Sequence, residues 1–418
     1  MSTKTVSATS AAPKSGRRKL TLPWILLIIA AGIVLVSLVR TVSGAEDLTS
    51  IGQISGALEL AIPIGLAGLG GLWAERAGVV NIGLEGMMIL GTWFGAWAGY
   101  QWGPWTGVLV GILGGALGGL LHAIITVTFN VNHIVSGVAV NILALGFTQY
   151  LSNFTFAEAA GGSSKQSPRI EGIKEITLPG ADWLADIQEK HWFLVSDLAG
   201  IIGGLVTELS LLTVVALLLI PGTWWVLWRT AFGLRLRSCG ENPVAAESLG
   251  VNVYKYKYIA VIVSGGLAGL GGAFLAIVST GIYQEGQTGG RGYIGLAAMI
   301  FGNWMPGGMA LGAGLFGFTD SLKLRGGAEN VLAMVLLIAI LLALFAGWQL
   351  YKKKYLQAGI SAVCAAVLFL GYLLIDEIPS QFVDAAPYVT TLLVLALSAQ
   401  RLRMPKADGM PYQKGQGK

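Results

Sequence analysis

The run VLAMVLLIAILLALFA, residues 331–346, has no charged side chain in sixteen consecutive positions. A helix that crosses a hydrocarbon core of roughly 30 Å needs about 20 such residues, so this run is nearly long enough. Residues 23–39 and 211–227 form similar runs. Charged residues make up 12% of the 418-residue chain, about half of the ~25% that is typical of soluble domains. The sequence therefore predicts an integral membrane protein.

Hydrophobic runs predict ten simple spans, and one further stretch is too long for a single span. The ten spans cover residues 23–39, 55–73, 86–100, 104–128, 133–151, 208–228, 257–279, 331–349, 357–375 and 387–399. The longer stretch, residues 292–324, contains the motif NWMPGG at positions 303–308. Proline and glycine interrupt a helix, and broken helices are common in transporters. We interpret this stretch as a broken pair of helices.

Basic residues indicate the orientation of the chain. The N-terminal tail, residues 1–22, is basic and is expected in the cytoplasm. If residues 292–324 cross twice, the clusters KKK (352–354) and RLRMPK (401–406) also face the cytoplasm. The sequence thus predicts an all-α, polytopic membrane helix bundle with about twelve passages and both termini cytoplasmic. The net charge of +5 follows from this loop asymmetry, so it does not indicate nucleic-acid binding.

This topology divides the chain into a membrane domain and two tails. The membrane domain spans residues 23–400, and a short tail, residues 401–418, follows it in the cytoplasm. Residues 152–206 form an external loop, where charges of both signs indicate a solvated surface. Residues 229–256 form a basic cytoplasmic loop.

The cytoplasmic loop contains a short polar segment, GENPVAAESLGVN, at positions 240–252. Asn242 suits a helix N-cap, Pro243 suits the first helical position, and Gly250 suits the residue that ends a helix. Three residues between them favour helix: Ala245, Ala246 and Glu247. A helix of about two turns is too short to be stable alone, so it should dock on a partner. An amphipathic turn that lies on the membrane surface is the alternative.

The sequence around this helix resembles a known family. RTAFGLRLRSCGENPVAAESLGVNVYKYKYIAVIVSGGLAGLGGAFLA (229–276) is similar to the coupling loop and following helix of ABC-importer permeases of the branched-chain amino acid, simple-sugar and nucleoside group. In that family the short helix seats in a cleft of the cytoplasmic ATPase subunit, and closure of the ATPases on ATP moves the permease. The resemblance implies a contact centred near Ala246 and Glu247. The residues it assigns to this contact are Glu241, Asn242, Pro243, Ala245, Ala246, Glu247 and Gly250.

A second stretch narrows the branch of the family. ERAGVVNIGLEGMMILGTWFGA (75–96) resembles the signature of nucleoside permeases, which are grouped with the simple-sugar permeases. Further matches are NHIVSGVAVNILALGFTQYL (132–151), GRGYIGLAAMIFGNWMPGG (290–308), FGFTDSLKLR (316–325), IPSQFVDAAPYVTTLLVLAL (378–397) and GMPYQKG (409–415). Residues 331–375 depart from the family as an extra hydrophobic pair, which we interpret as additional packing surface.

Polar residues in or beside the predicted spans are candidates for the translocation path. If their stretch is helical, Asn81 and Glu85 share one face, because they are four residues apart. A carboxylate in a span usually faces the bundle interior or an aqueous cavity, and Arg76 is a candidate partner for it. Asn141, in a later predicted helix, is a candidate for the translocation path for the same reason. Alternatively, Glu85 joins neighbouring helices by accepting hydrogen bonds, and Asn141 serves helix packing.

The resemblance also implies partners and a location. The partners are an ABC ATPase subunit, a second homologous permease subunit, an extracytoplasmic substrate-binding lipoprotein, a small polar substrate and membrane lipid. No nucleic acid and no cofactor are expected, and the location is a bacterial cytoplasmic membrane. The chain has no G-x-x-x-x-G-K-[ST] motif, so ATP hydrolysis is expected in a partner chain.

Other classes of function remain open at this stage. The same machinery could import a simple sugar. An ion-coupled secondary transporter is compatible with Glu85 and with the break at Pro306, but it leaves the coupling loop unexplained. A membrane enzyme is the weakest alternative, because the three histidines, His122, His133 and His191, form no H-E-x-x-H pair.

Overall fold

The computed structural model describes residues 22–325, 327–375 and 402–415. The regular secondary structure of these residues is helical, apart from two strands of two residues each, and turns and irregular segments connect the helices. The coarse prediction of an all-helical membrane bundle is therefore confirmed. The N-terminal tail up to residue 21 and the predicted span at 387–399 lie outside the described residues.

Fifteen α-helices follow one another along the described chain. They are α1 (Leu22–Ser43), α2 (Ile51–Arg76), α3 (Leu84–Trp102), α4 (Pro104–Ala123), α5 (His133–Thr155), α6 (Ala181–Gln188), α7 (Val195–Gly204), α8 (Leu211–Arg229), α9 (Ala231–Glu241), α10 (Pro243–Ser248), α11 (Val253–Phe274), α12 (Arg291–Phe301), α13 (Pro306–Arg325), α14 (Gly327–Tyr351) and α15 (Tyr355–Leu374). A 3₁₀ turn, η1 (Glu46–Thr49), precedes α2, and π-helical turns η2 (Ile124–Thr128) and η3 (Leu275–Ser279) extend α4 and α11. Strand β1 (Glu175–Ile176) of the predicted external loop pairs antiparallel with β2 (Leu209–Ser210), which directly precedes α8.

Seven helices of the described chain are long and apolar enough to cross a membrane. They are Ile51–Arg76, Pro104–Thr128, His133–Thr155, Leu211–Arg229, Val253–Ser279, Glu329–Tyr351 and Tyr355–Leu374. Each coincides with a predicted span. The predicted spans at 23–39 and 86–100 are the helices α1 and α3. The predicted break is also present, because α12 ends at Phe301 and α13 begins at Pro306. Twelve passages and the orientation of the termini stay predictions.

Glycine lets the central helices pack backbone against backbone. Helices α2, α3, α4 and α11 form the centre of the bundle. A Cβ on Gly115 of α4 would collide with the backbone of Gly265 and Gly269 in α11, and a Cβ on Gly91 of α3 would collide with Gly269 as well. Close approach of this kind is a major source of helix association in membranes. The glycine-rich segments of α4 and α11 therefore fix the spacing of these helices.

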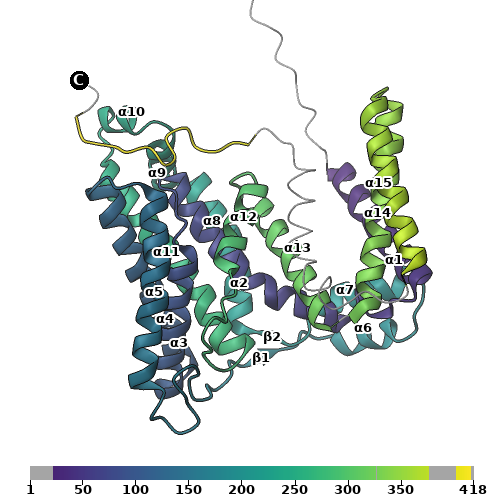
Figure 1. Ribbon diagram of the computed structural model, residues 1–418, viewed down its shortest axis with the longest axis horizontal. Coiled ribbons are helices and arrows are strands. Elements are labelled where there is room, and N and C mark those ends of the chain that lie inside the picture. The colour runs from purple at the N-terminus through teal and green to yellow at the C-terminus, as the bar shows by residue number, and fades with distance from the viewer. Residues whose placement is uncertain (1–21, 326, 376–401, 416–418) are drawn as a thin grey trace, which may run out of the picture.

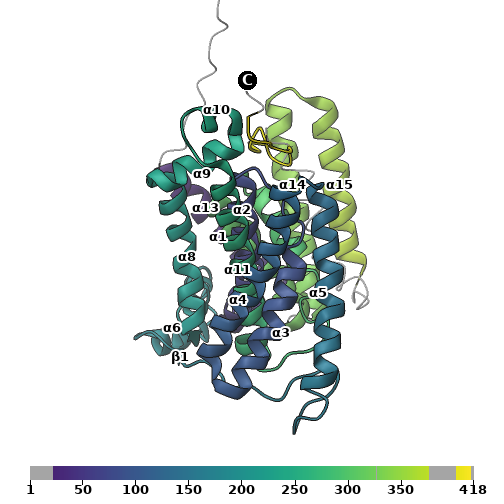
Figure 2. The ribbon, with the colours of Figure 1, turned by 90° about the vertical axis from the view of Figure 1, so that its left-hand side faces the viewer.

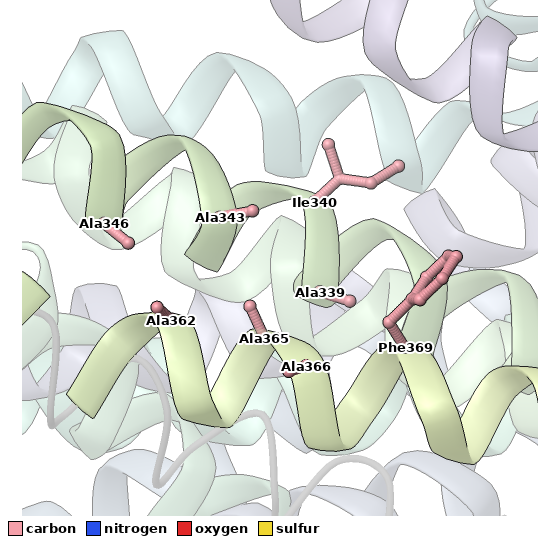
Figure 3. A pocket seen from close by; sticks show the side chains of 8 residues that line it. All are labelled: Ala339, Ile340, Ala343, Ala346, Ala362, Ala365, Ala366 and Phe369. Atoms are coloured by element: carbon pink, nitrogen blue, oxygen red, sulfur yellow. The ribbon is translucent and has the colours of Figure 1, made fainter. Parts of the chain in front are cut away.

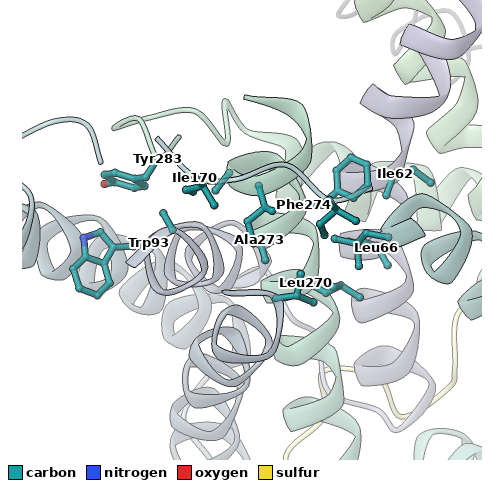
Figure 4. Close-up of a cluster of buried hydrophobic side chains, with 14 of the residues drawn as sticks. Ile62, Leu66, Trp93, Ile170, Leu270, Ala273, Phe274 and Tyr283 are labelled. Atoms are coloured by element: carbon teal, nitrogen blue, oxygen red, sulfur yellow. The ribbon is translucent and has the colours of Figure 1, made fainter. Parts of the chain in front are cut away.

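One hydrophobic cluster attaches the predicted external loop to the bundle (Figure 4). Ile170 from the loop and Tyr283 from the segment after η3 lie beside Trp93 of α3 and Phe274 of α11. The Trp93 Nε1 donates to the Ser152 Oγ at 3.0 Å, which anchors the buried indole. The loop is therefore anchored to the membrane helices by a few apolar residues, while most of its charged side chains are exposed, as predicted.

The extra hydrophobic pair forms a hairpin of α14 and α15, which packs against α1. Val39 of α1, Leu322 of α13 and Leu336 of α14 share a small buried cluster. An apolar hollow of about 330 Å³ lies between α14 and α15, and most of its lining is alanine (Figure 3). Its lining carries no polar side chain, so it offers nothing to hold a polar solute.

The two ends of the bundle differ. Both views place α9 and α10 at one end, together with the segment 402–415, and place α6 and β1 at the opposite end (Figures 1 and 2). The first end contains the predicted cytoplasmic loop and the second contains the predicted external loop.

Candidate functional site

The short helix predicted in the cytoplasmic loop is α10, and its ends are those expected from the sequence. The Asn242 Oδ1 accepts a hydrogen bond from the Ala245 amide at 3.0 Å, and Pro243 is the first helical residue. Gly250, with φ of +82°, follows the helix in a conformation that favours glycine. The preceding helix α9 was not predicted. It begins at an N-cap, Thr230, whose hydroxyl accepts from the Gly233 amide.

The two faces of α10 have different roles. Ala246 is only 2% exposed and packs against Cys239, Val253 and Tyr412. Leu249, at 85% exposure, and Val244 point away from the body of the protein. Leu249 is the C-cap residue of α10, so this large apolar side chain is accessible at the end of a capped helix. Ala246 therefore seats the helix, while its neighbours on the outer face are available for contact, a distinction that the sequence alone did not show.

The remaining residues assigned to this contact are distributed over both faces. Glu241 and Asn242 are exposed, whereas Glu247 is half-buried. The Glu247 Oε2 accepts from the Gly415 amide at 3.4 Å, and its carboxylate is hydrogen-bonded to the Tyr412 hydroxyl. Glu247 thus faces the C-terminal segment of the same chain.

The C-terminal segment, residues 402–415, crosses the end of the bundle and reaches α10 (Figure 1). The Arg403 amide donates to the Asn303 Oδ1 at 2.6 Å, in the break between α12 and α13. The Ala407 amide donates to the Gly240 carbonyl at 2.9 Å, at the end of α9. The ring of Tyr412 lies 5.5 Å from that of Tyr254 in α11. This segment therefore connects α10 and the end of α9 with the broken pair of helices. The motif GMPYQKG marked this segment as part of the family resemblance, but it did not indicate which helices the segment contacts.

Asp408 is the buried centre of this segment. Burial, and then the neighbouring Glu75 carboxylate, raises the pKa of Asp408 to about 9. Burial beside a second carboxyl group therefore favours the protonated form of Asp408. Glu75, near the end of α2, also accepts from the Trp304 Nε1 at 2.6 Å. The pair fastens the C-terminal segment to α2 and to the break between α12 and α13.

Arg76 does not pair with Glu85, so that expectation was wrong. The guanidinium of Arg76 donates through Nε and Nη2 to the Trp304 carbonyl at 3.1 and 2.6 Å. It also lies over the Trp228 ring at 5.2 Å, a cation–π contact between α2 and α8. The reason is that α2 ends at Arg76 while α3 begins only at Leu84. The connection at residues 77–83 is not helical, so the shared helical face expected for Asn81 and Glu85 does not exist either.

Glu85 instead caps the N-terminus of α12. Its Oε1 accepts from the Gly290 amide at 2.9 Å, and its Oε2 accepts from the Gly292 amide at 2.7 Å. A carboxylate is stabilised there by the free backbone N–H groups and by the helix dipole. Glu85 is buried, and it joins α3 to the shorter half of the broken pair.

Asn81 and Asn141 hold the non-helical connection in place. The Asn81 Nδ2 donates to the Ser264 Oγ at 2.9 Å, and its Oδ1 accepts from the Gly83 amide at 3.0 Å. The Asn141 Oδ1 accepts from the Gly86 amide at 2.7 Å, while its Nδ2 donates to the Tyr293 hydroxyl at 2.8 Å. These contacts brace the polypeptide. A direct role of these residues in the translocation path stays a prediction.

Comparison with known proteins identifies the family. Residues 53–346 match the family described as branched-chain amino acid transport system, permease component. The chain belongs to this permease family. The guanosine ABC transporter permease protein NupQ of Bacillus subtilis is 34% identical over 86% of this permease and 95% of its own length. The nucleoside ABC transporter permease protein NupC of Lactococcus lactis is 34% identical over 84% and 93%. No solved structure matches the permease.

Proposed function

We propose that this permease is the transmembrane subunit of an ATP-driven importer of nucleosides in a bacterial cytoplasmic membrane. Two relatives named for guanosine or nucleoside transport align with most of its length and support the choice of substrate. Among the structural observations, α10 carries the proposal. It is a capped helix that leaves Leu249 and Val244 exposed, at the end of the bundle opposite the predicted external loop. Such a helix offers a rigid surface to which an ATPase subunit can bind.

The proposed cycle uses three partner chains. An ATPase subunit binds the outer face of α10, a second homologous permease completes the path, and an extracytoplasmic lipoprotein delivers the solute. ATP-driven closure of the ATPases displaces α10 and the helix α9 before it. The segment 402–415 passes this displacement to α2 and to the break between α12 and α13, because it is hydrogen-bonded to both regions. Movement of the broken pair then changes access to the path.

The residues first assigned to the path have a bracing role in this proposal. Glu85 and Asn141 fix the start of α12, Asn81 fixes the connection between α2 and α3, and Arg76 fixes the break before α13. They keep the wall of the path rigid where its backbone is not helical.

A simple sugar is the second candidate substrate. The putative glucose ABC transporter permease protein TsgC13 of Haloferax volcanii is 34% identical over 66% of this chain and 77% of its own length. The NupQ and NupC matches cover more of this chain, so the nucleoside proposal is favoured. An ion-coupled transporter is a weaker proposal, because it gives α10 no role.

Uptake of labelled guanosine, adenosine, uridine and ribose, by cells with and without the gene, tests the proposal. Each assay is repeated with Leu249→Arg, which puts a charge on the outer face of α10, and with Leu249→Met as the matched control. Nucleoside uptake lost in the deletion and in Leu249→Arg, but kept in Leu249→Met, supports the proposal. Loss of ribose uptake alone would support the ATP-driven importer but would identify its substrate as a simple sugar. Unchanged uptake in the deletion rejects the proposed function.

A further inference from the structure

A polar cavity of about 280 Å³ lies between α2, the end of η3 and α13. Six polar side chains line it: Glu59, Ser279, Thr280, Gln287, Arg291 and Ser321. They come from three separate parts of the chain, and most of them lie within or beside the membrane helices. Polar groups at membrane depth are expensive, and they generally mark the route of a substrate.

Three of these side chains have a buried atom that finds no hydrogen-bond partner within the described part of the chain. The atoms are the Ser279 Oγ, the Gln287 Nε2 and the Arg291 Nε. Buried polar atoms are nearly always paired, so three unpaired atoms on one cavity call for an explanation. Ser279 is also the last residue of the π-helical turn η3, and such turns are frequent at functional sites. The arrangement is that of a surface prepared for a polar ligand.

The charges of the cavity indicate what kind of ligand it accepts. The Arg291 Nη2 lies 3.4 Å from the Asp320 Oδ2, so its positive charge is already paired. Glu59 adds a carboxylate to the same wall. Lys323 also acts on Asp320, so two basic and two acidic side chains balance around the cavity and no net charge is left to attract a nucleotide phosphate or an amino-acid carboxylate. Neutral hydroxyl groups suit this mixture, because each hydroxyl can both donate to a carboxylate and accept from an N–H group.

The cavity adjoins a second hollow on the predicted external side. It shares Ser279 and Thr280 with a wider hollow of about 500 Å³, which is also lined by residues 169–172 of the external loop. Helix α11 begins beside α10 and continues through η3 to Ser279, so the hollow lies at the end opposite α10. A solute that arrives at that end meets the wider hollow first and the polar cavity second.

We propose that the cavity between α2, η3 and α13 binds the ribose of the transported nucleoside. This inference rests on the proposed function. The Gln287 and Arg291 N–H groups donate to ribose oxygens, Ser279 provides a hydroxyl partner, and Glu59 accepts from ribose hydroxyls.

The test uses the complete transporter in proteoliposomes, with Ser279→Ala and Gln287→Met. The Ser279 Oγ has no hydrogen-bond partner among the described residues, so Ser279→Ala should assemble as the wild type does. Gln287→Met also removes the Oε1 that accepts from the Gln284 amide, so its assembly is measured by size-exclusion chromatography before the uptake is compared. Ser37→Ala is the matched control: its Oγ is also buried and unpartnered, but it lies in α1. Loss of one hydrogen bond to the solute should reduce uridine uptake about fivefold in each variant, and Ser37→Ala should match the wild type. If the wild type transports no nucleoside, the proposed function fails. If it does and both variants match it, this inference is overturned.

A labelling experiment covers the case in which a variant fails to assemble. Ser279→Cys is combined with Cys364→Ser, which removes the exposed native cysteine and leaves the buried Cys239. Uridine and ribose should each slow the reaction of the new thiol with a small methanethiosulfonate reagent, and uracil should not. Absence of protection by uridine overturns the proposal, and protection by uracil alone overturns the assignment to ribose.

Discussion

Replacement of Glu85 by alanine should loosen the start of α12. The carboxylate accepts from the Gly290 and Gly292 amides at 2.9 and 2.7 Å, with one oxygen for each. Hydrogen bonds to a charged group contribute about 1.5–3 kcal/mol each. Two bonds at the lower end of this range give about 3 kcal/mol, and each 1.4 kcal/mol corresponds to a factor of ten. Local opening of this helix terminus should therefore become about a hundredfold more frequent.

Hydrogen–deuterium exchange of the purified permease measures this opening at the Gly290 and Gly292 amides. Glu85→Gln keeps one acceptor oxygen but turns an NH₂ group towards a backbone donor. It should therefore lose about half of the free energy by which the carboxylate stabilises the start of α12. Glu158→Ala, at an exposed glutamate in the external loop, is the control. The cap would be refuted if these two amides exchanged in Glu85→Ala as slowly as in the wild type.

Three further predictions concern the end of the bundle that contains α10. Asn242→Ala removes the N-cap, which contributes about 1 kcal/mol, so the α10 amides should exchange about fivefold faster; Asn242→Asp should not show this. Asp408 has a pKa of about 9 when docked and an ordinary value of 3.8, so the docked segment binds a proton that the free segment releases. Docking should therefore weaken as the pH rises above ~4, and Asp408→Asn should reduce this dependence in limited proteolysis. Tyr412→Ala should uncover Cys239, which a maleimide then labels faster, whereas Tyr412→Phe should leave it covered. Cys364 is exposed and serves as the internal reference in every sample. Equal labelling of Cys239 in all variants would contradict the last prediction.

Much of the bundle could be predicted from hydrophobic runs, because a membrane span depends on length and apolar character alone. The helix α10 could also be predicted in detail, since the Asn242 cap, Pro243 and Gly250 act locally. The break before Pro306 is of the same kind. In each case the signal and its effect lie within a few residues of each other.

Contacts between distant residues could not be predicted in this way. Glu85 is bonded to amides more than 200 positions later in the chain, and nothing near it indicates that α12 begins there. The burial of Asp408 against Glu75 depends on the path of the whole C-terminal segment. The shared face expected for Asn81 and Glu85 failed because α2 stops at Arg76. Gly78, with φ of +82°, marks that end, and this local signal was missed.

In the proposed function, an ATPase subunit binds α10 and ATP thereby drives nucleoside import by this permease. The most direct test is uridine uptake by proteoliposomes that contain the permease and its ATPase subunits, supplied with the binding protein. Uptake should require ATP on the side of the ATPase, should persist without any ion gradient, and should be lost in Leu249→Arg. Uridine uptake driven by a proton or sodium gradient in the absence of the ATPase would contradict the account.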